Sequence, residues 1–166
     1  MFRYRFSWLL LTMIALATGP CHAGQTLDGP VLAEVVRVID GDTVLVEAMP
    51  WPDHRISTYV RLRGIDAPEL KSRCPAFRAA AREAQDQLTA LISDQQRVSL
   101  VDISGDKYFG RVVATLVLSD GRSPADLLLE AGLVEPYAGK AKAFVPCHIN
   151  TKGSSWRGSP SVFTAG

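Results

Sequence analysis

The sequence is poor in residues that bind soft metals: its 166 residues include three cysteines and three histidines. Cys74, Cys147, His54 and His148 are scattered along the chain, without the close pairs that a zinc site requires. A zinc-centred function is therefore not expected. The sequence also contains no apparent internal repeat, and its length is that of one domain with a sizeable core.

A hydrophobic run long enough to cross a bilayer, about 20 residues, is also missing. The apolar run from Trp8 to Ala17 is shorter; it follows Arg3 and Arg5 and precedes small residues near Ala23. This order is typical of a secretory signal peptide. We expect residues 1–23 to be cleaved after Ala23 and the mature protein to be periplasmic or secreted, without membrane attachment. An uncleaved anchor, or a lipid on Cys21, is the alternative.

An excess of positive charge is absent as well. Without residues 1–23 the chain keeps 16 of its 18 Lys and Arg residues and all 17 Asp and Glu residues, which leaves a formal charge of −1. Such a chain does not hold duplex DNA by bulk charge, so any nucleic acid must bind at a local site. The charge is nevertheless uneven, because no acid follows Glu135 whereas four bases do: Lys140, Lys142, Lys152 and Arg157.

Export also affects what the two remaining cysteines indicate. In an oxidising compartment an even pair favours a disulfide. We therefore expect a bond between Cys74 and Cys147 that ties the C-terminal segment to the body of the domain. Two separate thiols are the alternative.

The pattern of apolar residues divides the chain into a linker at 24–30, a domain at 31–139 and a basic tail at 140–166. The tail contains Gly, Ser and Pro, so we expect little regular structure in it. β-Branched and alternating runs predict strands, and three- and four-residue apolar spacing predicts helices. The expected strands are Val31–Ile39, Thr43–Val46, Ser57–Ile65, Arg97–Asp102 and Arg111–Leu118, and the expected helices are Pro75–Asp94 and Ala125–Ala131.

Residues 49–55 are interpreted as a loop, and the Asp-Gly pair at 40–41 predicts a hairpin turn. The long helix falls between the third and fourth strands, and the second helix is short. Five short strands in this order predict a β-barrel with helices (α+β) of the OB-fold type.

Three motifs carry polar residues that are ambiguous singly and informative together. Asp40-Gly41-Asp42-Thr43 and Asp66-Ala67-Pro68-Glu69 place carboxylates at strand ends, where they can ligate Ca²⁺ or Mg²⁺. Arg61, Arg63 and Arg111 offer guanidinium groups that suit phosphate oxygens. A glutamate beside a metal can serve as a general base for water. Taken alone, each motif also fits a turn, a solvated strand face or a loop.

In order and spacing these motifs, with Arg61-Leu62-Arg63-Gly64-Ile65 and Tyr108-Phe109-Gly110-Arg111, resemble the staphylococcal nuclease family. The segment from Leu127 to Val134 is similar to the family's second helix. The resemblance covers about residues 31–139 and implies a five-stranded OB-fold-type barrel of the staphylococcal nuclease kind.

The resemblance also implies a role for each matching position. Asp42, Asp66 and the carbonyl of Ala67 would bind Ca²⁺, with Asp40 reaching the ion through water. Glu69 would activate or orient the attacking water, and Arg61 and Arg111 would bind the scissile phosphate. The substrate-binding residues would be Arg63, Tyr108, Phe109 and Tyr137. The expected activity is Ca²⁺-dependent hydrolysis of DNA, RNA or both to 3′-phosphate ends by a monomer without a stable protein partner.

The chain departs from the family pattern at two places. Phe109 stands where the namesake enzyme has a tyrosine, so it can stack on a base but cannot donate a hydrogen bond. The segment from Leu70 to Cys74 is shorter than the namesake's basic loop. A non-catalytic nucleic-acid-binding barrel is the alternative function, although such a binder is expected to lack Glu69, Arg61 or Arg111, and all three are present.

Overall fold

The computed structural model describes residues 26–93, 95, 97–139 and 147, so the expected signal peptide and most of the expected tail lie outside the described residues. The strands are β1 (Thr26–Leu27), β2 (Val31–Asp40), β3 (Thr43–Trp51), β4 (His54–Leu62), β5 (Ile65–Asp66), β6 (Val98–Gly105), β7 (Arg111–Val117) and β8 (Glu135–Pro136). The helices are α1 (Pro75–Ser93) and α2 (Pro124–Glu130).

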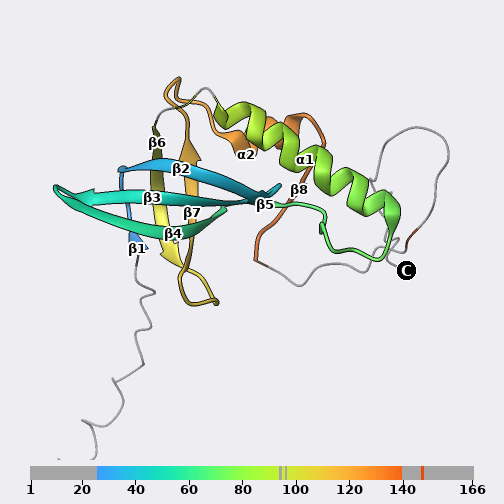
Figure 1. Ribbon diagram of the computed structural model, residues 1–166, viewed down its shortest axis with the longest axis horizontal. Helices are drawn as coiled ribbons and strands as arrows, with labels where there is room; N and C mark the ends of the chain where they lie inside the picture. The colour runs from blue at the N-terminus through green and yellow to red at the C-terminus, as the bar shows by residue number, and fades with distance from the viewer. Residues whose placement is uncertain (1–25, 94, 96, 140–146, 148–166) are drawn as a thin grey trace, which may run out of the picture.

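Five of these strands close into a barrel in the order β2-β3-β4-β7-β6, since β6 pairs with both β2 and β7. The barrel is mixed, because β4 and β7 run parallel whereas the other neighbours are antiparallel. Figure 1 shows β6 and β7 crossing the long strands β2, β3 and β4. The helix α1 lies between the third and fourth barrel strands in the chain. The predicted five-stranded OB-type barrel with helices is therefore confirmed.

The barrel interior is filled by alternating apolar side chains of the strands, as the period of a half-buried strand requires. Val44, Val46, Val60 and Leu62 are fully or almost fully buried, and Leu100 and Leu116 of β6 and β7 pack into the same core. The end of the barrel is covered by α1, which presents Ala81, Ala84, Leu88 and Ile92 at helical spacing. No described helix is both long and apolar enough to cross a membrane.

The predicted loop at residues 49–55 is wrong in its extent. Strand β3 continues to Trp51 and β4 begins at His54, and these two residues pair. Pro52 and Asp53 alone form the turn, with Asp53 in the left-handed region at φ 63°. The prolines and acid that indicated a loop are thus concentrated at the tip of one long hairpin, and Thr26–Leu27 adds a short strand within the segment expected to be a linker.

The predicted third strand, Ser57–Ile65, is interrupted before its end. Strand β4 ends at Leu62, and Gly64 turns the chain with a φ of 83° that other residues rarely adopt. The next two residues form β5, which pairs with β8 in a separate two-stranded sheet. The backbone N–H of Tyr137 then donates to the carbonyl of Gly64 at 2.8 Å. This small sheet brings the end of the domain back to the end of β4.

Gly41 allows α1 to lie close to the turn between β2 and β3. A Cβ atom at this position would lie 2.7 Å from Cβ of Ala84 and 2.9 Å from Cβ of Ala67. The φ of Gly41 is not positive, so the glycine is required by close packing rather than by the turn conformation. Beside it, Gln85 of α1 donates from Nε2 to the carbonyl of Ile39 at 2.8 Å.

Replacing Gly41 with alanine is expected to lower the free energy of unfolding by about 1–3 kcal/mol, the usual cost of overpacking a close contact. The matched control is Gly105→Ala, because a Cβ there has nothing within 4 Å and its φ is not positive. Denaturant unfolding of the two variants measures the difference. Equal stability of both variants would show that the contact with Ala84 relaxes without cost.

The expected disulfide is present between Cys74 and Cys147, whose Cα atoms lie 5.7 Å apart. Cys74 is buried just before α1, so the bond fixes Cys147 at the start of that helix. The two residues are 73 positions apart in the sequence, and the bond therefore closes a long loop.

Replacing both cysteines with serine is expected to lower the free energy of unfolding by roughly 3–5 kcal/mol, because the unfolded chain regains the freedom that the closed loop removes. Thermal unfolding with and without a reductant measures this effect. The double variant, which has no bond to reduce, is the control and should not respond to the reductant. A wild-type protein that is equally stable after reduction would contradict the prediction.

Candidate functional site

The turn between β2 and β3 holds Asp42 in a buried position. One carboxylate oxygen, Oδ2, accepts a hydrogen bond from the backbone N–H of Ala67 at 2.9 Å, and Oδ1 accepts one from the hydroxyl of Thr43 at 2.9 Å. The N–H of Asp42 itself donates to Oδ1 of Asp40 at 3.1 Å. Asp40 therefore shapes the turn and supports the position of Asp42.

Arg61 of β4 joins the carboxylates of Asp42 and Asp66. Its Nη1 donates to Oδ1 of Asp42 at 2.7 Å, and its Nη2 donates to Oδ1 of Asp66 at 2.6 Å. The register explains this convergence, because Thr43 pairs with Arg61 across β3 and β4 and places the preceding turn at the arginine. The ring of Tyr137 lies 5.6 Å from the guanidinium carbon of Arg61.

The ion pairs of Arg61 with Asp42 and Asp66 are largely buried. The side chains of Arg61, Asp42 and Asp66 keep 18%, 5% and 16% of their surface exposed. Burial opposes the charge on Arg61, but attraction and hydrogen bonds from the two carboxylates outweigh it and raise the arginine pKa. Burial also raises the pKa of Asp42, and the N–H of Ala67 and the charge of Arg61 offset only part of that effect. Asp42 thus depends on these partners to remain ionised.

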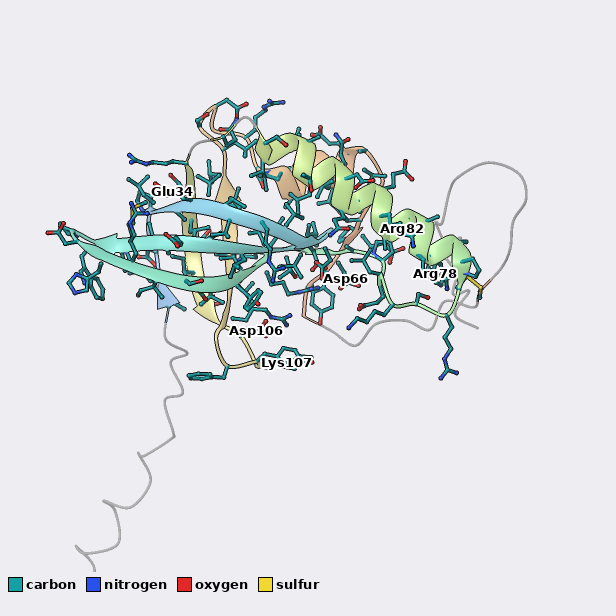
Figure 2. All side chains as sticks on the ribbon, viewed as in Figure 1. Glu34, Asp66, Arg78, Arg82, Asp106 and Lys107 are labelled. Atoms are coloured by element: carbon teal, nitrogen blue, oxygen red, sulfur yellow. A yellow bond between two sulfur atoms is a disulfide. The ribbon has the colours of Figure 1, made fainter. Side chains whose placement is uncertain are left out.

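A second arginine pair lies at the loop between β6 and β7. The Nε of Arg111 donates to Oδ2 of Asp106, and the Arg111 guanidinium lies over the ring of Tyr108 at 4.6 Å. Burial raises the pKa of Asp106, but hydrogen bonds from Arg111 and from the N–H of Lys107 reverse this and hold it below its ordinary value. Figure 2 shows Asp106 and Lys107 below and to the left of Asp66.

The two arginine pairs share one open cleft of about 740 Å³. Its charged lining comprises Arg61, Arg63, Asp66, Glu69, Asp106, Lys107 and Arg111, and its aromatic lining comprises Tyr108 and Tyr137. Seven of the predicted site residues therefore meet in one cleft. They come from β4, the turn after it, β5, the loop after β5, the β6–β7 loop, the start of β7 and the segment after β8. Such a cleft has the charges and flat rings to receive a phosphodiester and its bases.

The other predicted residues lie around this cleft. Asp40, Asp42 and Ala67 do not line the cleft, and Asp42 is linked to it through its bond with Arg61. Phe109 is fully exposed on the loop tip, at 109%, and does not line it either. Arg63 lines the cleft, yet its Nη2 donates to Oγ of Ser104 at 2.8 Å and to the carbonyl of Val113 at 3.1 Å. Substrate binding by Arg63 and Phe109 stays a prediction.

Sequence reasoning missed Asp106 and Lys107, which line the cleft directly. Their position just before Tyr108-Phe109-Gly110-Arg111 was the available signal, since a charged residue beside a phosphate-binding motif is a natural partner for its arginine. Sequence alone did not separate this role from that of a solvated loop acid.

The carboxylates of Asp42 and Asp66 are the type of ligand that a hard cation binds. Asp42 and Asp66 point oxygen atoms at the same guanidinium, so they converge on one place, and carboxylate oxygens are the donors that Ca²⁺ prefers. Among the described residues, no group of three or more His, Cys, Asp and Glu side chains gathers as a complete metal site. A cation held here would therefore need backbone carbonyls and water in addition to the two carboxylates.

The family model for staphylococcal nuclease homologues matches residues 59–144, about half of the sequence. The match includes Arg61, Asp66, Glu69 and Arg111, whereas Asp42 precedes it and joins the site through strand pairing. No curated protein matches the chain.

Arg61→Ala is expected to lower the free energy of unfolding by about 3 kcal/mol, because it leaves two partly buried carboxylates without their cation. The matched control is Arg97→Ala: Arg97 is 61% exposed and pairs with Glu34 at 3.6 Å, and such a surface pair contributes about 0–1 kcal/mol. Urea unfolding compares the two. Adding Asp42→Asn and Asp66→Asn to Arg61→Ala should recover stability; a further loss would contradict the role assigned to the ion pair.

Proposed function

The chain belongs to the family of staphylococcal nuclease homologues, and on that basis we propose that it is a metal-dependent phosphodiesterase that hydrolyses DNA, RNA or both. Membership of the family suggests a nuclease-like or nucleic-acid-binding function. The observation that favours hydrolysis is the meeting of Glu69, Arg61 and Arg111 in one cleft. A binding surface alone needs the arginines, whereas a glutamate beside them repels phosphate, and its presence favours a role as proton acceptor.

Calcium is the cation that we propose for this site. Asp42 and Asp66 would hold it, with the carbonyl of Ala67 and water as further ligands and Asp40 supporting Asp42. When bound, the ion would neutralise phosphate charge and lower the pKa of attacking water. Both carboxylates already accept hydrogen bonds from Arg61 through Oδ1, so the cation and Arg61 would share the two carboxylates.

The arginines would bind the scissile phosphate. Arg111 lines the cleft, and its guanidinium can form two parallel bonds with phosphate oxygens. Arg61 also lines the cleft, with its guanidinium beside the ring of Tyr137. It would stabilise the negative charge that grows on the phosphoryl oxygens during attack. Neither residue supplies a covalent intermediate, so their contribution is position and charge.

Glu69 would accept the proton of the attacking water. The oxygen of this water bonds to phosphorus as the bond to the 5′-oxygen breaks, and the released 5′-oxygen takes up a proton. The phosphate then remains on the 3′ side, as in the family. Because water is the nucleophile, the ribose 2′-hydroxyl is not required, and both DNA and RNA are candidate substrates.

Aromatic rings at the cleft would hold the bases next to the scissile bond. Tyr108 and Tyr137 line the cleft, and stacking on such rings contributes about 1–3 kcal/mol per base with little sequence preference. Stacking requires unpaired bases, so single-stranded substrates should be cut faster than duplexes.

Digestion of single-stranded DNA and RNA by the purified protein tests the proposal. Cleavage is expected with added Ca²⁺ and should stop when a chelator is added. Cleavage that ignores the chelator would refute the metal mechanism. Oligonucleotide binding without cleavage under any divalent cation would instead assign the non-catalytic binding function.

Glu69→Gln is expected to lower kcat by about 10²–10⁴-fold, the usual contribution of a general base, while oligonucleotide affinity stays equal or rises slightly because a negative charge has left the cleft. The matched control is Glu83→Gln, which removes the same charge from an exposed position on α1. Steady-state kinetics and a binding titration of both variants separate rate from affinity. Unchanged kcat in Glu69→Gln would show that another group is the base.

A further inference from the structure

The guanidinium of Arg111 is hydrogen-bonded to the protein through Nε, whereas its two terminal nitrogens have no such bond among the described residues. Its Nε donates to Asp106, and Tyr108 covers one face of its guanidinium at 4.6 Å. Within the described part of the chain, its two terminal nitrogens have no protein acceptor, and the residue lines the cleft. A guanidinium fixed through Nε keeps both terminal nitrogens for one phosphate, which is the arrangement that gives two parallel hydrogen bonds.

Asp106 is itself fixed in place. Its side chain is only 9% exposed, and its Oδ1 accepts the backbone N–H of Lys107 at 2.6 Å. The N–H of Asp106 donates to the carbonyl of Arg111 at 3.3 Å, and the N–H of Arg111 donates to the carbonyl of Tyr108 at 3.3 Å. The loop from Asp106 to Arg111 is therefore closed by its own backbone.

The charge of Asp106 runs against the proposed use of the cleft. A carboxylate in this lining repels a nucleic acid, and hydrogen bonds from Arg111 and Lys107 keep it ionised. Its removal should therefore improve substrate attraction if charge alone mattered. The position of Asp106 is instead explained by its hydrogen bond with Arg111, whose guanidinium it holds in place.

We propose that Asp106 is a positioning residue for phosphodiester hydrolysis, which acts by fixing the guanidinium of Arg111 so that its terminal N–H groups face the scissile phosphate. Tyr108 supports the same orientation from one face of the guanidinium. The inference rests on the proposed nuclease function, and it predicts opposite effects of Asp106 on binding and on rate.

The test is the steady-state kinetics of Asp106→Ala on a single-stranded oligonucleotide with Ca²⁺. We expect kcat to fall about 100-fold, the scale of a misplaced catalytic group, while KM stays equal or decreases because a negative charge has left the cleft. Asp106→Asn keeps the shape and an acceptor oxygen, so it should recover part of kcat. A raised KM with unchanged kcat would overturn the inference.

The second test compares Asp106→Ala in the wild-type protein with the same substitution in the Arg111→Ala variant. In Arg111→Ala, adding Asp106→Ala should cause no further loss of kcat, because Asp106 acts only through Arg111. The same fall in both backgrounds would show a general structural effect and overturn the inference. The matched control is Asp120→Ala, which breaks a similar pair with Arg122 outside the cleft and should leave kcat unchanged.

An NMR measurement separates this inference from the proposed function. The Nε–H signal of Arg111, assigned by its loss in Arg111→Lys, should exchange with water about tenfold faster in Asp106→Ala than in the wild type. Equal exchange would overturn the positioning by Asp106 whether or not the protein is a nuclease. Protected exchange in a wild type that cleaves nothing would support the contact but refute the catalytic consequence.

Discussion

The ion pair that Arg61 forms with Asp42 and Asp66 is the interaction on which the site depends. Its three members come from β4, the β2–β3 turn and β5, so it joins the barrel to β5, which belongs to a separate two-stranded sheet. A buried carboxylate without a cation is costly, and Asp42 is almost completely buried. The pair therefore fixes the turn against β5, and β5 pairs with β8, which leads into Tyr137.

Close packing makes this ion pair possible. Ala67 must lie near the turn for its N–H to reach Asp42, and α1 covers the same place with Ala84. Only a glycine at position 41 leaves room for both alanines. Small residues in the turn, the β5 loop and the helix thus share one contact, and the polar bonds of Asp42 depend on it. The packing around Gly41 and the hydrogen bonds of Asp42 therefore cannot be changed independently.

The barrel, and Arg61 and Arg111 as site residues, could be predicted from the sequence because each depends on local sequence signals. Alternation predicted the strands, helical spacing predicted α1, and the three motifs matched one family. The long hairpin was missed because Pro50 and Pro52 are typical of loops, yet a hairpin tip tolerates them. The contacts of Arg63 and Asp106 were missed for another reason. Arg63, just after β4, contacts Ser104 of β6 and Val113 of β7, and Asp106 of the β6–β7 loop contacts Arg111 at the start of β7. No periodicity reports which partner a charged side chain meets.

The pairing of charges within the cleft agrees with the nearly balanced charge of the whole sequence. Four cations line the cleft, Arg61, Arg63, Lys107 and Arg111, but three acids face them, Asp66, Glu69 and Asp106. The field of the cleft is therefore small, and a phosphate gains little until its oxygens meet individual N–H groups. Binding that depends on geometry loses less to salt than binding by released counterions. For the phosphodiesterase proposed above, a cleft with this balance of charges favours recognition of one backbone phosphate over capture of long nucleic acids.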